Sequence, residues 1–168
     1  MPLARVTIQK EFGRFRWREA AKPRGGIIIA GDWILDHLTR IDPPLPLVEG
    51  RGRPLKTIAC HALIADHLLA ALRDIKSTSD ALIHTFDGCF VARHTNWDPK
   101  KPLSHHSWGI AVDINAAQFP YGSHKRQDRA LIRIFANRGF EWGGTWRIPD
   151  PMHFEYSALE NLHQEPHR

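Results

Sequence analysis

The chain has 168 residues, of which 42% are hydrophobic and 24% charged, so it is long enough to bury a core without disulfides or structural metals. Its 23 basic and 18 acidic residues give a formal net charge of +5, which favours an anionic partner without identifying one. Two cysteines exclude a disulfide framework, and the absence of any run of about 18 apolar residues excludes a transmembrane helix.

Basic and aromatic residues alternate near the start of the chain. The alternating residues are Phe12, Arg14, Phe15, Arg16, Trp17 and Arg18. This pattern occurs on nucleic-acid-binding surfaces and equally on an edge strand with one buried face, which we favour. The first 26 residues contain no apolar run typical of a signal peptide. We therefore expect synthesis in a cytoplasm, and release or delivery by other means if the substrate lies outside.

The middle of the chain predicts three further elements. Residues 41–54 are rich in proline and glycine and form a connection that is too short and too apolar for an interdomain linker. Apolar residues at helical spacing predict a helix from Ile58 to Ile75. Residues 81–93, ALIHTFDGCFVAR, predict a β-hairpin that turns at Asp87-Gly88. Cys60 and Cys89 are expected to be buried thiols, with a bridge between them as the alternative.

The second half predicts one more helix and two short strands. The helix lies within residues 123–139, with Ser123 as its N-cap and Gly139 just past its end. The strands are Ile110–Ile114 and Met152–Tyr156. Because strands and helices do not alternate regularly, we predict an α+β fold with a small central antiparallel sheet and flanking helices. We expect one domain over residues 1–168, with an N-terminal extension, 1–57, packed on it.

Both predicted strands carry polar residues on the face opposite their large apolar residues. Asp113 alternates with the apolar positions of its strand, and His106 precedes it by seven residues. In the second strand His153 and Glu155 share a face, and Asp150 lies just before them. Two histidines and one carboxylate from separate strands are typical of a catalytic zinc site with an open fourth position. Asp150 would accept a proton there.

The spacing leaves a simpler alternative open, in which His106 and His153 are hydrogen-bonded surface histidines. The chain has 11 histidines, and most of them are expected to have no functional role. Histidines without a matching partner pattern are His37, His61, His67, His163 and His167.

Two motifs of this chain resemble those of a known family. The first is Ser104-x-His106-x-x-Gly109-x-Ala111-x-Asp113, and the second is Trp142-Gly143-Gly144 followed by Asp150-x-x-His153. Together they resemble the zinc D-alanyl-D-alanine carboxypeptidase family, which includes the vancomycin-resistance D,D-dipeptidases and the phage L-alanyl-D-glutamate endopeptidases. The resemblance runs from about Asp80 to Tyr156 and implies the fold that D,D-peptidases share with Hedgehog proteins.

The resemblance also implies a role for each motif residue. It implies that His106, Asp113 and His153 bind one zinc ion and that Asp150 is the general base. His105 occupies a variable position of the motif, so His106 is preferred as the ligand. Many members of the family have glutamate at the position of Asp150. The aspartate in this chain resembles the residue found in the endopeptidase branch of the family.

Three further residues are candidates for contact with the substrate. Arg93 follows the predicted hairpin, where similar family members place an arginine near the scissile carbonyl or a substrate carboxylate, and its alternative is a surface arginine. Ser104 and Trp142 are candidate substrate-binding residues, although a tryptophan near such motifs is as often part of the core.

The function expected from the resemblance is zinc-dependent hydrolysis of the stem peptide of bacterial peptidoglycan by metal-activated water. We favour an endopeptidase over a D,D-carboxypeptidase, acting as a monomer without a nucleic-acid partner, and a phage or prophage context is compatible. One alternative is a non-catalytic zinc-containing binding module or phage structural component, in which a positioned base would serve no purpose. A metal-dependent nuclease is less favoured, because the chain lacks a carboxylate-rich magnesium cluster.

Overall fold

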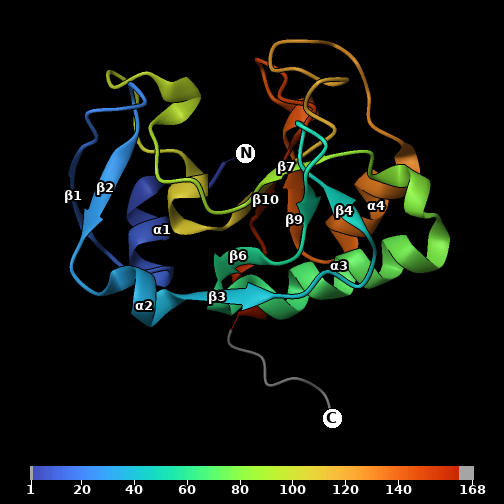
Figure 1. The fold of residues 1–168 in the computed structure, drawn as a ribbon, viewed down its shortest axis with the longest axis horizontal. Coiled ribbons are helices and arrows are strands. Elements are labelled where there is room, and N and C mark those ends of the chain that lie inside the picture. Colours follow the sequence, from blue (N-terminus) through green and yellow to red (C-terminus); the bar gives the residue numbers. More distant parts are fainter. Residues whose placement is uncertain (1, 163–168) are drawn as a thin grey trace.

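A computed structural model describes residues 2–162 and confirms the predicted α+β class (Figure 1). The α-helices are α1 (Arg5–Glu11), α2 (Trp33–His37), α3 (Ala65–Thr78) and α4 (Arg129–Asn137). The strands of the first half are β1 (Arg16–Glu19), β2 (Ile27–Ala30), β3 (Leu38–Ile41), β4 (Leu47–Val48), β5 (Pro54–Leu55) and β6 (Ile58–His61). Those of the second half are β7 (Phe86–Gly88), β8 (Ala111–Ile114), β9 (Phe140–Trp142) and β10 (His153–Tyr156).

A four-stranded antiparallel sheet carries both sequence motifs. Its strand order is β7-β8-β10-β9, so the two strands predicted from the sequence, now β8 and β10, are neighbours at its centre. Their register pairs His153 with Asp113 and Phe154 with Val112. Since directly paired residues project to the same face, the sheet places the polar residues of both motifs together. Both strands were predicted to within one residue of their observed bounds.

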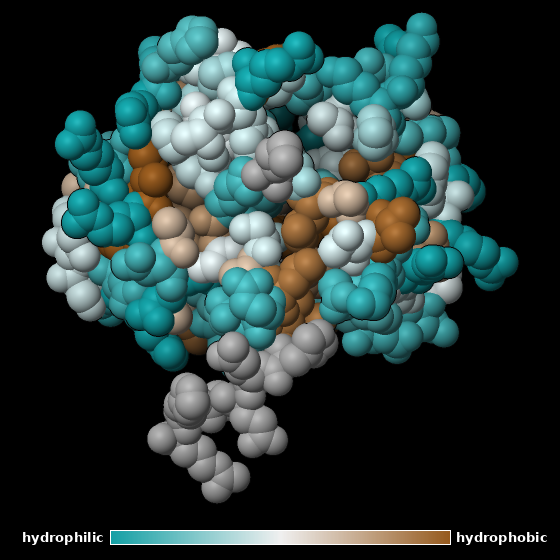
Figure 2. All heavy atoms as spheres, turned by 180° about the vertical axis from the view of Figure 1, so that it is seen from behind, coloured by the Kyte–Doolittle hydropathy of each residue, from teal (hydrophilic) through white to brown (hydrophobic). Residues whose placement is uncertain are grey.

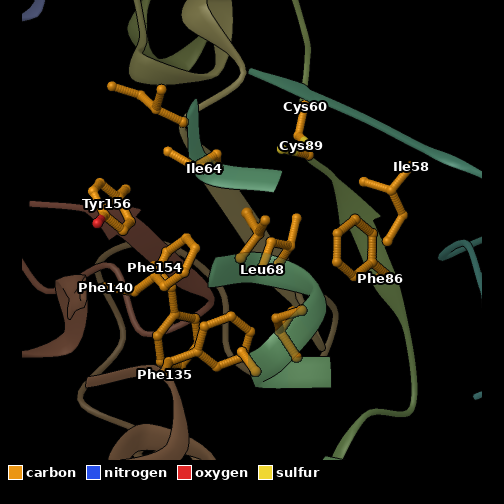
Figure 3. Close-up of a cluster of buried hydrophobic side chains, with 14 of the residues drawn as sticks. Ile58, Cys60, Ile64, Leu68, Phe86, Cys89, Phe135, Phe140, Phe154 and Tyr156 are labelled. Carbon is orange, nitrogen blue, oxygen red and sulfur yellow. The ribbon is translucent and has the colours of Figure 1, made fainter. Parts of the chain in front are cut away.

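Aromatic side chains fill the core between this sheet and α4 (Figure 3). Phe135 of α4 stacks on Phe154 of β10, with ring centroids 4.5 Å apart. Phe140 contacts Phe135 and Tyr156 edge-on, at 5.4 and 5.3 Å. Each such buried side chain contributes on the order of 1.5–3 kcal/mol to folding. The apolar face of β10 therefore anchors the strand whose opposite face carries His153.

The basic-aromatic segment forms a strand, as favoured from the sequence. Strand β1 pairs with β2 in a two-stranded antiparallel sheet at one edge of the molecule (Figure 1). Arg14, Arg16 and Arg18 are exposed, whereas Phe15 and Trp17 are half-buried against the core. Helix α1, which precedes this strand, was not predicted.

The predicted helix 58–75 is wrong over its first residues. Ile58–His61 is strand β6, which pairs with β3, and the α-helix runs only from Ala65 to Thr78. Ile58 and Cys60 are buried beside β3, so tertiary pairing decides their conformation.

The predicted hairpin of residues 81–93 is also wrong. Phe86–Gly88 pairs with β8 instead of with the residues that follow it, and Asp80–Leu82 is a short 3-10 helix. The strand β7 thus includes Asp87 and Gly88, which were predicted as the turn, and its partner lies far along the chain.

Helix α4 begins five residues later than the N-cap Ser123 would place it. Asp128 is the N-cap, and its Oδ1 accepts a hydrogen bond from the amide of Ala130 at 2.7 Å. The preceding Gln127 is buried and donates to the carbonyl of Ile114 at 2.7 Å, a tertiary contact that draws these residues out of the helix. The predicted end is confirmed, because Gly139 follows α4 with φ +88°.

Both cysteines are free and buried, as expected from the sequence, and Figure 3 shows Cys89 beside Cys60 of β6. No helix in the described part of the chain is long and apolar enough to cross a bilayer. The face seen in Figure 2 is largely hydrophilic, with hydrophobic residues gathered near its middle. The number of domains stays a prediction, and His163 and His167 lie outside the described residues.

Candidate metal centre

A cavity of about 180 Å³ contains almost all of the predicted site residues. Its lining includes Arg93, Ser104, His106, Asp113, Asp150 and His153 from the predicted set, together with Pro2, Thr95, Asn96, His105, Trp146, Met152 and Glu155. The cavity lies over the polar face of β8 and β10, where the two motifs meet.

His106 reaches the cavity from a short 3-10 helix, His105–Trp108, just before β8. Ser104 is its N-cap, with Oγ 3.4 Å from the amide of His106. The helix ends at Gly109 with φ +66°, where a Cβ would lie 2.9 Å from the amide nitrogen of His61. Glycine is required at this turn by both the backbone conformation and the close approach, and this turn directs the chain from His106 into β8.

Asp113 and His153 face each other across β8 and β10. The Oδ1 of Asp113 lies 3.0 Å from the Nδ1 of His153, and its Oδ2 lies 3.2 Å from the Nε2 of His106. One ligand atom from each of the three residues can be chosen so that all lie within 4.8 Å of one another. All three side chains are buried. The structure thus brings together the three residues proposed as ligands, while their role in metal binding stays a prediction.

The orientation of the His106 ring leaves one nitrogen free for a ligand. Its Nδ1–H donates to the carbonyl of Cys89 at 2.9 Å, which directs Nε2 into the cavity. This Nε2 is buried and, despite its nearness to Asp113, makes no hydrogen bond. A buried polar atom without a partner is costly, so this nitrogen is available as a ligand for a cation.

The charges in the cavity are strongly coupled. Burial alone would raise the pKa of Asp113, but His106 and His153 outweigh it and lower that pKa below its ordinary range. Burial alone would lower the pKa of His153, but its hydrogen bonds to Asp113 and Glu155 raise it to about 10. In the absence of a metal, His153 therefore holds a proton between two carboxylates.

Glu155 and His105 form a second layer behind His153. The Oε2 of Glu155 accepts from the Nε2 of His153 at 3.1 Å and from the Nδ1 of His105 at 2.7 Å. Burial alone would raise the pKa of Glu155, but these two hydrogen bonds lower it to about 2. Glu155 therefore orients the imidazole of His153 so that Nδ1 faces Asp113 and the cavity. The sequence placed Glu155 on this face but contained no signal for the contact with His105.

Asp150 lies in the turn before β10, at the edge of the same cavity. Its amide donates to the carbonyl of Gly143 at 2.9 Å, and its carbonyl accepts from the amide of His153 at 3.1 Å. Its Oδ1 is buried without a hydrogen-bond partner. Burial is the main cause that raises the pKa of this carboxyl to about 6. A carboxylate with a pKa near the working pH is suited to general-base chemistry.

Arg93 points into the cavity from a backbone segment held on both sides. The backbone amide of Arg93 donates to the Oγ of Ser107 at 3.0 Å, and the same hydroxyl donates to the backbone carbonyl of Arg93 at 2.8 Å. These two hydrogen bonds fix the backbone of Arg93. Its Nη2 lies 3.8 Å from Oδ2 of Asp113, and its guanidinium lies 5.5 Å from the ring centroid of Trp97. Arg93 is thus a cation beside the predicted ligands.

Among the predicted substrate-binding residues, Ser104 lines the cavity but Trp142 does not. Trp142 is buried and donates from Nε1 to the carbonyl of Pro151 at 2.9 Å. Trp146 lines the cavity instead, with its ring centroid 5.3 Å from that of His153. Its Nε1–H donates to Oε1 of Glu141 at 2.9 Å. The sequence could not separate these tryptophans, because Trp142 ends β9 and Trp146 follows only four residues later.

A larger cavity, of about 670 Å³, lies under the β4–β5 hairpin and beside residues 86–91. It contains three arginines but lacks the histidine–carboxylate arrangement of the smaller one. The carbonyl of Cys89, on its floor, is the acceptor for His106. The predicted site residues other than Trp142 therefore line the smaller cavity and not the larger one.

A comparison with known protein families finds a match over the segment that carries both motifs. Residues 97–156 match the model of a family described as D-alanyl-D-alanine carboxypeptidase. The matched segment includes His106, Asp113, Asp150 and His153, whereas Arg93 lies just before it. No curated protein and no solved structure matches the chain.

Proposed function

We propose that this protein is a zinc-dependent peptidase that hydrolyses a peptide bond in the stem peptide of bacterial peptidoglycan. The observation that carries the proposal is the convergence of His106, Asp113 and His153, with ligand atoms within 4.8 Å of one another, beside the carboxylate of Asp150 in one cavity. The match of residues 97–156 to the carboxypeptidase family supports the same class of reaction.

The residues of the cavity fit zinc. Two imidazoles and one carboxylate are the donor types that zinc prefers, whereas magnesium and calcium favour sites made of oxygen ligands. The unpartnered Nε2 of His106 and the Nδ1 of His153 both face Asp113, so the donors converge from three sides. Zinc held by these residues would supply a Lewis acid that polarises the substrate carbonyl and makes water more acidic.

The other charged residues of the cavity transfer the proton, stabilise the developing charge and position a ligand. Asp150, with its pKa raised to about 6, accepts a proton from the attacking water and returns it to the departing amine. Arg93 donates hydrogen bonds to the negative charge that develops on the carbonyl oxygen, or to a carboxylate of the substrate. Glu155 holds the ring of His153 in place and is not needed as a base.

The bond that we favour lies within the stem peptide, so that the protein acts as an endopeptidase. The aspartate at position 150 is the feature that favours this over a D,D-carboxypeptidase. We further propose one zinc per monomer, and access to the wall by release or delivery, as in a phage or prophage.

Digestion of purified peptidoglycan, followed by mass spectrometry of the fragments, tests the function directly. We expect cleavage within the stem peptide by the wild-type protein and cleavage slowed by about 10²-fold or more in the matched control Asp150→Asn. Release of terminal D-alanine alone would identify a carboxypeptidase instead. Degradation of DNA or RNA, with peptidoglycan left intact, would contradict the whole proposal.

A further inference from the structure

The cavity of the candidate metal centre opens into a wider groove of about 550 Å³. Both are lined by Pro2, Thr95, Asn96, Trp146 and Asp150, so the groove adjoins the cavity beside Asp150. The groove is of a size that holds a small organic ligand. It is therefore a continuation of the proposed active site.

The floor of this groove is an apolar shelf formed by Tyr121, Trp146 and Ile148. Tyr121 and Ile148 are large hydrophobic residues that are 42% and 50% exposed. Exposed apolar surface that adjoins a site commonly marks a ligand-binding surface. Arg147 lies at the rim of the shelf and is exposed.

Hydrogen bonds hold the shelf in place without a ligand. The amide of Gly122 donates to the carbonyl of Pro149 at 2.7 Å, which ties the loop of Tyr121 to that of Ile148. The ring of Trp146 is fixed by its hydrogen bond to Glu141. A surface ordered in advance loses little conformational entropy when it binds.

The chemistry of the shelf suits a sugar ring better than an extended peptide. Recognition of a peptide backbone requires free main-chain donors and acceptors, but the amides of Gly122, Trp146 and Asp150 already donate to carbonyls within these loops. A pyranose ring instead has an apolar face of C–H bonds and a rim of hydroxyl groups. An aromatic and aliphatic shelf with a polar rim matches both parts.

We propose that the shelf of Tyr121, Trp146 and Ile148 binds a sugar ring of the glycan strand to which the stem peptide is attached. This inference rests on the proposed function and deepens it. Because the peptide joins the glycan through its amino end, the shelf receives the amino-terminal side of the substrate. A bond near that end brings a sugar onto the shelf, whereas removal of terminal D-alanine leaves the sugar several residues away.

Paired substrates test this assignment. The same stem peptide is supplied free or attached to its N-acetylglucosamine–N-acetylmuramic acid disaccharide, and kcat/KM is measured for each. We expect the wild-type protein to prefer the attached peptide by about tenfold or more, in line with stacking on more than one side chain. The double variant Tyr121→Ser/Ile148→Ser should lose most of this preference. The matched control Val6→Ser/Leu35→Ser replaces residues that are 72% and 81% exposed outside the groove, and should keep it.

The outcomes separate this proposal from the proposed function. Equal cleavage of both substrates by the wild-type protein would overturn the shelf and leave the peptidase in place. If neither substrate is cleaved, the proposed function fails, and titration of the disaccharide followed by NMR then tests the shelf alone. Binding that is lost in Tyr121→Ser/Ile148→Ser supports a sugar site, and absence of binding by the wild-type protein overturns it.

Discussion

The pair His106–His153 and the pair His37–His61 show what distinguishes a candidate metal centre from a structural cluster. The rings of the first pair lie 5.1 Å apart and those of the second 5.6 Å, so proximity alone does not separate them. Asp113 lies between the first pair. The second pair packs instead against the ring of Trp33, at 5.0 and 5.9 Å.

His61 and His106 differ in how the backbone uses their ring nitrogens. In His61, Nε2 bonds to the carbonyl of Phe12 and Nδ1 accepts from the amide of Leu63, each at 3.2 Å. Both nitrogens are therefore used by the backbone. In His106 the backbone uses only Nδ1, and Nε2 is left without a partner. A histidine becomes available for chemistry when the fold satisfies one nitrogen and leaves the other facing a carboxylate.

Replacement of one histidine from each pair is the strongest test of this contrast. His153→Ala should lose the metal and lower the activity by at least about 10⁴-fold, since a bound metal ion supplies several kcal/mol of transition-state stabilisation. His61→Ala should keep about one zinc per chain and lose on the order of 1–3 kcal/mol of stability, because a buried amide loses its acceptor. Metal analysis and urea unfolding measure both. Equal metal loss in the two variants would remove the contrast.

Asp150→Asn tests whether Asp150 acts as a base or as a metal ligand in the candidate metal centre. The amide keeps the size of the side chain but cannot accept a proton at neutral pH, so we expect a folded, zinc-loaded protein with activity lowered by about 10²- to 10⁴-fold. Steady-state kinetics and metal analysis on the same preparation check this. Loss of zinc would make Asp150 a ligand. Full turnover, together with loss of turnover in Glu155→Gln, would transfer the role of base to Glu155.

Arg93→Ala asks whether the cation beside the cluster takes part in the reaction. Loss of one preorganised donor should lower kcat/KM by about 10²-fold, with zinc content nearly unchanged. Arg93→Lys should be similarly impaired, because an ammonium group does not reproduce the paired donors of a guanidinium. Near-normal kinetics in both variants would make Arg93 a structural residue.

Glu155→Gln should lower the zinc affinity of the candidate metal centre without abolishing zinc binding. Loss of the carboxylate that orients a metal-binding histidine typically costs about 10- to 100-fold in metal affinity. We expect an increase of that size in the zinc dissociation constant, measured by competition with a chelator, and recovery of activity when zinc is added in excess. An unchanged zinc affinity would contradict the positioning role of Glu155.

The contribution of His61 to stability should appear as a difference in pH dependence between the wild-type protein and a variant that lacks this histidine. Burial is the main cause that lowers the pKa of His61 from its ordinary value of 6.5 to about 4. The unfolded chain therefore binds more protons as the pH falls through this range, and the stability present above pH 6.5 is lost toward pH 4. The loss attributable to His61 is about 3 kcal/mol. Urea unfolding between pH 7.5 and 4.5, with a chelator present, should show a shallower decline in His61→Phe. Parallel curves would contradict this assignment.

The local sequence was sufficient for the elements that carry the site. Alternating apolar residues predicted β8 and β10 to within one residue of their observed bounds, and this alternation also placed Asp113, His153 and Glu155 on the polar faces. The α+β class followed from the irregular order of strands and helices. These features depend on the periodicity of neighbouring residues, which is present in the chain before it folds.

The sequence was insufficient wherever a residue's conformation depends on a distant partner. Ile58–His61 has apolar residues compatible with a helix but forms β6 because β3 lies beside it. Phe86–Gly88 pairs with β8 instead of closing a hairpin. Trp146, and not Trp142, reaches the cavity, because the turn after β9 directs one ring outward and the other into the core.

The candidate site likewise has features that the sequence predicts and features that only the tertiary structure determines. Residue types and spacing, together with the family resemblance, selected His106, Asp113, Asp150 and His153, and the structure brings all four to one cavity. Only the packed structure decides which nitrogen each histidine presents. The carbonyl of Cys89 and the carboxylate of Glu155 set those orientations, and both come into place through contacts between separate segments, which spacing along the chain does not encode.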